Sequence, residues 1–490
     1  MRTTDVTSRA KGIHFVLDNS PVLLIAALGL LLRLWQLGHE NFWLDELGVA
    51  NAAFQPTLSQ ALKAANEHIM AMPLDYIIAW IAARWSHAES WLRLPEAIWG
   101  FLTLLAGYKL SLKLSANKRV ALFSLLMLAL SPILIAYSQE LRFYAPLIFF
   151  FTLSLYFGLE AVQRSRPKDW LTFTLVTLLG IYFHLYAILA VGTVLMWLAV
   201  YFGRPDWEQR RDAFAVSALV LSIAFLVGMF TFGGVYAERK LSLFMYESFS
   251  SFLFSGLGWS PAFPASAAGW LFGLLMMSFG WLGVITSIRK NPLDPSAILF
   301  YGAVLQIMMV VLFDIFRNYP LFARQIVMLV PVTTYFAAQG VDWSIEQILA
   351  HSQSASRTAW TTGAFFALFV LAALPALHQY YQSKKGSHQD ILAILTEQWQ
   401  VPEPIHVEAG VLEVFTYYWS QDPGNQSLVT ALTPLDYNST DGWHSPSPAW
   451  FVINYPPAEG TENALRAVGF IPVYTPTYNT LHPQMLWHRK

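Results

Sequence analysis

The chain has 490 residues, of which 55% are hydrophobic and only 12% are charged, and its formal net charge is −1. Soluble globular proteins carry about 25% charged residues, so this composition excludes an ordinary soluble domain. The near-neutral charge gives no case for nucleic-acid binding, and the lack of cysteine excludes disulfides, thiol catalysis and thiolate metal sites.

Long apolar stretches follow one another over the first three-quarters of the chain. Their length, about 17–23 residues, matches helices that cross a hydrocarbon core about 30 Å thick. We therefore predict an all-α polytopic membrane protein. The eleven predicted spans are 21–37, 95–114, 119–137, 145–162, 169–184, 186–203, 213–233, 266–288, 296–314, 323–340 and 359–377.

The segment Pro73–Trp85 is also apolar, but it is too short to span and contains Asp75. We predict that it lies in the membrane interface as an amphipathic helix. With the N-terminus in the cytoplasm, the cytoplasmic loops then hold about half of the 30 basic residues, roughly twice as many as the outer loops. A spanning Pro73–Trp85 would reverse every later loop, so the charge distribution favours the interfacial helix and a bacterial plasma (inner) membrane protein.

The composition changes after Leu377, where the chain becomes rich in Pro, Asn, Ser and Thr. We expect residues 1–377 to form the membrane domain, with a first outer loop at 38–94, and residues 378–490 to form a small α/β domain outside. Asp390–Gln400 is a predicted helix. The predicted strands are Ile405–Val407, Ser427–Ala431, Trp450–Asn454 and Phe470–Tyr474. No glycine-rich phosphate loop occurs, so no nucleotide cofactor is expected.

Two adjacent carboxylates, Asp45 and Glu46, follow the first predicted span. Carboxylates beside a bilayer are costly unless they bind or react with something. One interpretation is a solvated loop start or an N-terminal cap for a helix over Leu47–Phe54. The other is a general base, Asp45, whose neighbour Glu46 orients it or helps to hold Mg²⁺ or Mn²⁺.

A second polar segment, Ser138–Tyr144, separates the third and fourth predicted spans. Glu140 and Arg142 are its only charges. Arg142 suits a bidentate grip on a phosphate, with Tyr144 as a further donor. An arginine that snorkels to the interface is the structural alternative.

A third segment before the tenth predicted span holds Arg317, Tyr319 and Arg324, which suit either a lipid phosphate or ordinary headgroup anchoring. His184 lies in the short turn between the fifth and sixth spans, between Tyr182 and Tyr186. A single interfacial histidine is more often structural than a ligand, so His184 is a weaker candidate for the substrate pocket. Glu140 is a second weaker candidate for this pocket.

These motifs together resemble the GT-C superfamily of membrane glycosyltransferases. The resemblance is to the group of dolichyl-phosphate-mannose–protein mannosyltransferases and the lipid A aminoarabinose transferase, and it is strongest over residues 21–200. The motifs that carry it, in order, are Phe42–Glu46, Pro73–Tyr76, Leu92–Pro95, Ser138–Tyr144 and Tyr182–Tyr186.

This resemblance implies an inverting glycosyltransferase that takes a sugar from a polyprenyl-phosphate donor in the outer leaflet. The acceptor would be a lipid, a glycan or a protein. Asp45 matches the first-loop acidic residue that such enzymes use as a base or metal-linked carboxylate. At the start of the interfacial helix, relatives often carry His-Pro-Pro or a Lys before Pro, whereas this chain has Ala71-Met72-Pro73. His68, which lies just upstream, is the candidate to replace the basic side chain of the relatives.

Two other classes of protein remain open from the sequence. A flippase for polyprenyl-linked sugars would be expected to place ionisable residues at mid-membrane depth, whereas the candidates here gather on one face. An O-antigen polymerase or ligase also acts on outer-leaflet polyprenyl glycans, but usually centres on arginines in large outer loops and lacks a first-loop Asp-Glu pair.

Overall fold

The computed structural model describes residues 20–66, 72–232, 249–260, 267–317, 321–350, 354–435, 449–454, 461–476, 480–482 and 484–489. The chain forms two units. The first comprises Met1–Leu37, Ala52–His87 and Trp91–Tyr380, and the second comprises Gly38–Asn51, Ala88–Ser90 and Tyr381–Lys490.

The first unit is helical. Besides the helix Ser20–Leu34, its long helices are α5 (Glu89–Ser115), α8 (Tyr144–Arg164), α9 (Pro167–Phe183), α11 (Trp207–Phe232), α13 (Leu271–Lys290), α14 (Pro295–Arg317), α15 (Val330–Leu349) and α16 (Ala355–Gln382). The shorter ones are α3 (Leu58–Asn66), α4 (Pro73–Ala83), α6 (Lys118–Leu130), α7 (Pro132–Ser138), η1 (Leu185–Leu189), α10 (Ala190–Ala199), α12 (Phe249–Gly256), η3 (Ala267–Trp270), η4 (Ala323–Gln325) and η5 (Val327–Leu329). The helix α2 (Leu44–Ala53) begins in the second unit and ends in the first.

Ten of the predicted spans overlap one helix or two consecutive helices, and the span 323–340 overlaps three. Among the described residues, five helices are long and apolar enough to cross a membrane, and six if the bent pair α6 and α7 counts as one span. These two helices meet at 59°, because Pro132 cannot continue the hydrogen-bond ladder of α6. The predicted span 323–340 starts later than expected, since η4 and η5 occupy Ala323–Leu329 and α15 begins at Val330.

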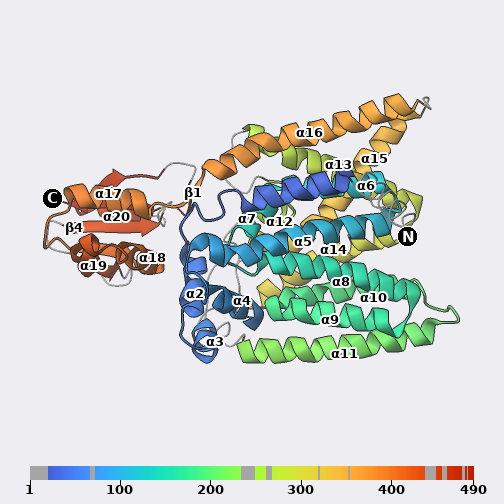
Figure 1. The fold of residues 1–490 in the computed structure, drawn as a ribbon, viewed down its shortest axis with the longest axis horizontal. Helices are drawn as coiled ribbons and strands as arrows, with labels where there is room; N and C mark the ends of the chain where they lie inside the picture. Colours follow the sequence, from blue (N-terminus) through green and yellow to red (C-terminus); the bar gives the residue numbers. More distant parts are fainter. Residues whose placement is uncertain are drawn as a thin grey trace, which may run out of the picture. The chain divides into compact units, whose positions relative to one another are not determined.

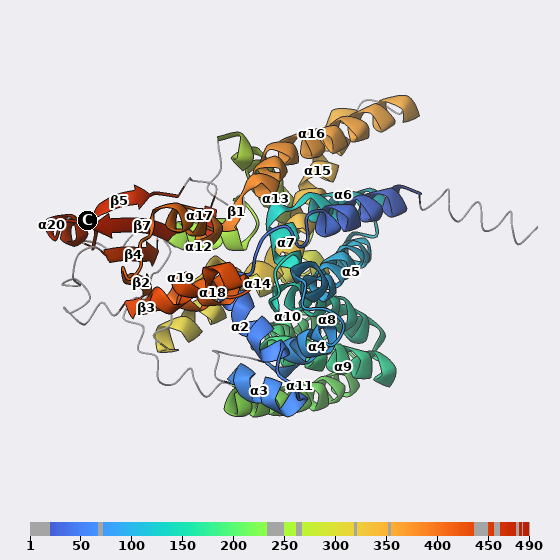
Figure 2. The same cartoon turned by 60° about the vertical axis from the view of Figure 1, so that its left-hand side comes forward.

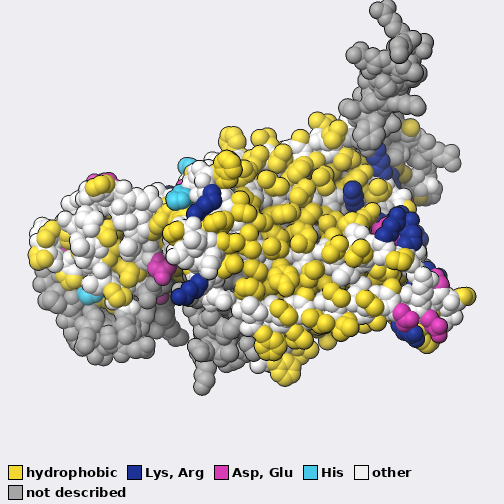
Figure 3. Space-filling view, turned by 60° about the horizontal axis from the view of Figure 1, so that its bottom comes forward, with side chains coloured by type: hydrophobic (Ala, Val, Ile, Leu, Met, Phe, Trp, Pro, Cys, Tyr) yellow, Lys and Arg dark blue, Asp and Glu magenta, His cyan; other side chains and the backbone are white. Residues whose placement is uncertain are grey.

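The helices α8, α9, α10 and α11 run side by side (Figure 1). On the visible face of this unit, hydrophobic side chains cover the middle and Lys and Arg gather toward the ends (Figure 3). Glycine allows α13 and α15 to approach closely: a Cβ on Gly283 would lie 1.9 Å from the Phe336 carbonyl oxygen, and one on Gly340 would lie 2.0 Å from that of Phe279.

The second unit contains a five-stranded sheet with the order β3-β2-β4-β7-β5. Its strands are β2 (Ile405–Glu408), β3 (Leu432–Leu435), β4 (Ala449–Asn454), β5 (Ile471–Tyr474) and β7 (Gln484–Arg489). β2 pairs in parallel with β3 and β4, whereas β7 is antiparallel to β4 and β5. A separate parallel pair joins β1 (Lys384–Gly386) to β6 (Thr480–His482).

Successive residues of β4 point to opposite faces of this sheet. Trp450 and Val452 pack with α17 (His388–Gln398), α18 (Ala409–Trp419) and α19 (Gln426–Ala431), which follows the short turn η6 (Pro423–Asn425). Phe451 and Ile453 pack on the other face with Leu465 of α20 (Thr461–Ala467). The sheet, coloured orange to red in Figure 2, therefore has a buried apolar layer on each side.

The prediction of a strand at Ser427–Ala431 is wrong. This segment is the helix α19, and the strand β3 follows it at Leu432. The Thr430 hydroxyl donates to the Gln426 carbonyl oxygen at 2.6 Å, a bond to the preceding turn that helical backbone allows. Leu428 is buried in the core under the sheet, so tertiary packing decides the conformation of a segment with strand-like composition.

Candidate active site

The polar segment between α7 and α8 is held in place by Gln139. Its amide nitrogen donates to the carbonyl oxygens of Arg33 at 2.9 Å and Trp35 at 2.7 Å. Its amide oxygen accepts from the Tyr380 hydroxyl at 2.7 Å. The loop that carries Glu140 and Arg142 is therefore tied to the first helix and to α16, which reduces the freedom of Arg142 before any ligand arrives.

Arg142 lies against aromatic rings at the start of α8. Its guanidinium carbon is 4.7 Å from the ring centroid of Phe143 and 5.9 Å from that of Tyr144. Tyr144 is buried and packs against Tyr137, with ring centroids 4.6 Å apart. Stacking of this kind fixes the plane of the guanidinium.

Three basic side chains from distant segments, Arg142, His184 and Arg324, lie near one another at the end of the helical unit where α8 begins. His184, which is only 8% exposed, interacts electrostatically with both Arg142 and Arg324. Its ring centroid is 4.5 Å from that of Phe143. Arg324, on η4, has its guanidinium carbon 4.5 Å from the Phe322 ring centroid. The sequence predicted each residue separately, and the structure brings Arg142, His184 and Arg324 together.

The hydrogen bonding of His184 fixes its tautomer. The Tyr186 backbone N–H donates to Nδ1 at 3.2 Å, so in the neutral ring the proton lies on Nε2. His184 also caps the turn η1 through this bond. The Nε2–H group can thus act as a third donor beside the two arginines, and the structural and functional roles of this residue are compatible.

Two buried carboxylates near Arg142 were not predicted as site residues. Asp75 in α4 and Glu96 in α5 are each 2% exposed and interact electrostatically with each other. Within the described residues, neither oxygen of Asp75 has a hydrogen-bond partner. Burial raises the pKa of Asp75 to about 7, although Arg142 opposes this shift. The signal in the sequence was an acidic residue inside a short apolar helix.

A third unpredicted carboxylate, Asp314, is fully buried near the end of α14, beside Gln325 and Tyr186. The Tyr186 ring centroid lies 4.8 Å from that of His184. The polar groups of α14 and η4 therefore continue the group formed by His184 and the two arginines.

Asp45 and Glu46 lie in the first turn of α2, within the second unit. The predicted helix start at Leu47 is wrong, because α2 begins at Leu44 and so includes both carboxylates. The Trp43 backbone N–H donates to Glu46 Oε2 at 3.5 Å, the reverse arm of a capping box. Glu46 is fully buried, whereas Asp45 is half-buried. The two carboxylates thus differ, since Glu46 caps the helix and Asp45 is more accessible.

The remaining candidates are placed as follows. Glu140 is 9% exposed in the loop that leads to Arg142. His68 and Tyr319 lie outside the described residues, as does the side chain of Arg317, the last residue of α14.

The expected divalent cation lacks a ligand set in the part of the chain that the structure describes. No three His, Asp or Glu side chains there come close enough to hold a metal ion. Asp45 and Glu46 alone provide two carboxylates on one helical turn, and Glu46 is engaged as a cap. These residues do not fit a metal centre.

About a third of the chain matches a known protein family. Residues 71–230 match the family model described as dolichyl-phosphate-mannose-protein mannosyltransferase. This match covers α4, the loop with Arg142 and the turn with His184. No curated protein sequence matches the chain significantly.

Solved structures extend the likeness over most of the chain. ArnT from Cupriavidus metallidurans in the apo state has a TM-score of 0.56 at 13% identity, over 96% of this chain and 98% of that chain. The same protein bound to undecaprenyl phosphate gives 0.53 at the same identity and coverage. The apo oligosaccharyltransferase of Archaeoglobus fulgidus gives 0.50 at 13% identity, over 85% of this chain and 64% of that chain. The protein shares the fold of ArnT and of the archaeal oligosaccharyltransferase, and the family model confirms the predicted resemblance to the dolichyl-phosphate-mannose–protein mannosyltransferase group.

Proposed function

We propose that this protein is an inverting glycosyltransferase that acts on the outer face of the plasma (inner) membrane and uses a polyprenyl-phosphate sugar donor. The observation that carries the proposal is that Arg142 and Arg324 both lie near enough to His184 to act on it electrostatically, at one end of the helical unit. Two arginines and a neutral imidazole donor suit a phosphate whose negative charge grows as it leaves. A protein of the same fold has been crystallised with undecaprenyl phosphate.

The proposed step is a single displacement at the anomeric carbon of the donor sugar. The acceptor hydroxyl oxygen forms a bond to this carbon while the bond from the carbon to the phosphate oxygen breaks. The electron pair leaves with the polyprenyl phosphate, which Arg142, Arg324 and His184 stabilise. Asp45 accepts the proton of the acceptor hydroxyl, a contribution of roughly 10²–10⁴-fold.

The topology is part of the same proposal. The N-terminus lies in the cytoplasm. The second unit, which includes Asp45, lies on the outer side of the membrane. The acceptor is a lipid, glycan or protein that reaches the outer leaflet. A transporter of the same lipid-linked sugar would need ionisable groups halfway along its helices. Glu96 and Asp314 instead lie within two turns of the helix ends that carry the Arg142 group.

Donor binding tests the role of Arg142 directly. We expect Arg142→Gln to weaken the affinity of purified protein for decaprenyl phosphate by about 10–100-fold, since a hydrogen bond to a charged group contributes about 1.5–3 kcal/mol. Arg204→Gln is the matched control, because Arg204 also stacks on an aromatic ring, that of Tyr201 at 4.5 Å, but is exposed at the other end of the helices. Equal affinities of both variants would refute the assignment of Arg142.

A further inference from the structure

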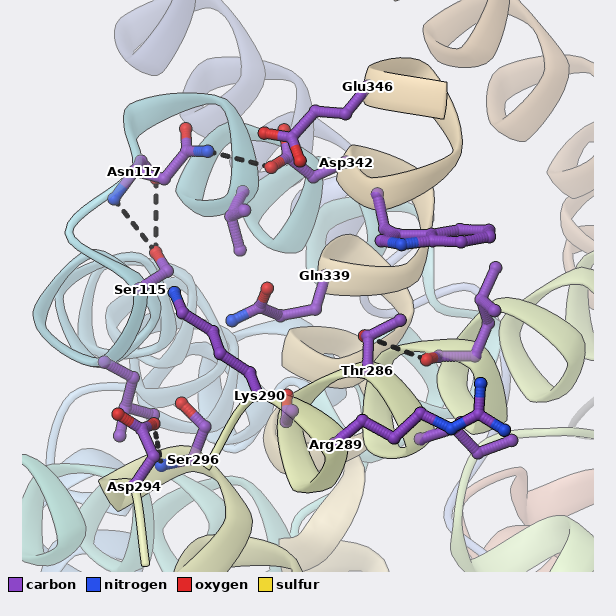
Figure 4. A pocket seen from close by; sticks show the side chains of 16 residues that line it. Ser115, Asn117, Thr286, Arg289, Lys290, Asp294, Ser296, Gln339, Asp342 and Glu346 are labelled. Carbon is purple, nitrogen blue, oxygen red and sulfur yellow. Dashed lines mark hydrogen bonds between the residues drawn. The ribbon is translucent and has the colours of Figure 1, made fainter. Parts of the chain in front are cut away.

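A polar cavity lies in the helical unit, at the end opposite Arg142. It has a volume of about 470 Å³, within the usual range of ligand sites, roughly 300–1,000 Å³. It is formed where α5 and α13 end, where α14 begins, and by the second half of α15 (Figure 4). The groups assigned to sugar transfer do not line it.

The carboxylates around this cavity have partners within the chain. Asp342 accepts from the Asn117 amide at 2.9 Å and pairs with Arg119. Asp294 accepts from the Ser296 backbone N–H at 3.0 Å and so caps α14. Glu346, the third carboxylate of the lining, lies 3.7 Å from the guanidinium of Arg119. All three carboxylates therefore have partners other than the two cations that line the cavity.

The two cations of the cavity differ in this respect. Arg289 and Lys290, in the last turn of α13, are exposed and make no ion pair or side-chain hydrogen bond with any residue that the structure describes. In Figure 4, Lys290 points across the cavity toward Ser115 and Gln339. The C-terminal end of a helix favours cations, but this preference does not explain a lysine directed into a polar cavity.

The rim of the cavity is apolar. Ile285 and Trp343, which line it, are 43% and 38% exposed. In a membrane protein, exposed large apolar side chains at such a position face lipid chains, and tryptophan prefers the level of the head groups. The cavity thus combines two cations that make no ion pair with any described residue, neutral polar groups such as Gln339, and an apolar exit, which together fit an amphiphile with an anionic head.

We propose that this cavity binds the head group of an anionic phospholipid. Lys290 and Arg289 take the phosphate, Gln339 and Ser115 bond to head-group hydroxyls, and an acyl chain leaves along Ile285 and Trp343. The lipid serves the protein as a bound structural or regulatory partner. The site does not depend on the proposed transfer reaction, because it lies at the other end of the same helices.

A titration of the purified full-length protein in a neutral detergent tests this site. Short-chain phosphatidylglycerol is added, and its half-saturation concentration is read from the rise in unfolding temperature. Glycerol phosphate and inorganic phosphate are the two comparison ligands without acyl chains. We expect phosphatidylglycerol to saturate at concentrations at least tenfold lower than either of these ions.

Variants assign the effect to the cavity. We expect Arg289→Gln with Lys290→Gln to raise the half-saturation concentration at least tenfold, and Lys290→Arg to leave it near that of the wild type. The matched control is Lys168→Gln with Arg357→Gln, which removes two exposed cations at the same end of the helices but outside the cavity. Equal saturation of the cavity and control variants would overturn the proposal. So would equal saturation by inorganic phosphate and phosphatidylglycerol, because the cavity would then take a free anion.

Discussion

The Tyr380 hydroxyl donates a hydrogen bond of 2.7 Å to the side-chain amide oxygen of Gln139, which lies 241 positions earlier in the chain. Both side chains are buried, and the Gln139 amide nitrogen holds the end of the first helix. This pair fixes the loop between α7 and α8 from two sides, so residues far from any substrate contribute to the placement of Arg142.

We expect Tyr380→Phe to reduce both stability and transfer. Loss of the hydroxyl removes one donor to a buried amide, which costs about 1 kcal/mol of unfolding free energy. It also loosens the Arg142 loop, so turnover should fall severalfold. Thermal unfolding and initial rates measure these effects, with Tyr201→Phe as the control at the far end of the helices. Wild-type rates in Tyr380→Phe would show that the loop is held without this bond.

Glu46 should behave as a helix cap and not as a group needed for the reaction. Glu46→Ala removes the acceptor for the Trp43 N–H and should cost about 0.5–2 kcal/mol of unfolding free energy. Glu46→Gln keeps a side-chain oxygen there and should restore stability and most of the turnover. Normal stability with lost turnover in Glu46→Gln would instead demand a carboxylate at this position.

Asp75 should make stability depend on pH. Its pKa in the folded protein is raised to about 7 by burial, against 3.8 as the ordinary value. The folded state therefore binds more protons than the unfolded state between these values, and stability falls as pH rises toward 7. In Asp75→Asn this contribution is lost, so its unfolding temperature should fall less than that of the wild type between pH 5 and pH 8. Parallel pH profiles of the two proteins would contradict the assignment.

His388 in the second unit should act in the opposite direction. Burial lowers its pKa to about 4, although Asp390 opposes this shift. Its Nε2 accepts from the Asn41 amide at 2.5 Å, and its ring stacks on that of Tyr418. The stability that the neutral ring provides is present above pH 6.5 and is lost as pH falls through about 4. Unfolding temperatures at pH 7 and pH 5 should therefore differ more for the wild type than for His388→Gln.

The helical architecture could be predicted from the sequence because apolar length and loop charge are strong local signals. The start of α15 at Val330 could not be predicted. The composition of Ala323–Leu329 is equally compatible with one helix and with the two short 3₁₀ helices η4 and η5. The strand predicted at Ser427–Ala431 failed for a related reason, because the core contact of Leu428 overrides local preference.

The candidate site was predicted only in part. Arg142, His184 and Arg324 were found as polar residues in otherwise apolar surroundings, but their meeting depends on how α8, α9 and η4 pack. Asp75, Glu96 and Asp314 were missed because each lies within an apolar helix where the sequence shows no loop. The different roles of Asp45 and Glu46 depend on where α2 begins, and the prediction from the sequence placed this start three residues too late.

The most direct test of the account is release of polyprenyl phosphate by the purified protein in nanodiscs. Wild type and Asp45→Asn are supplied with a panel of polyprenyl-phosphate sugars and a membrane lipid extract as the source of acceptor. We expect the wild type to release polyprenyl phosphate from at least one donor. We expect Asp45→Asn to bind this donor normally but to release polyprenyl phosphate at least 100-fold more slowly. Equal release by Asp45→Asn would contradict the role of Asp45, and donor translocation without any release would contradict the transferase itself.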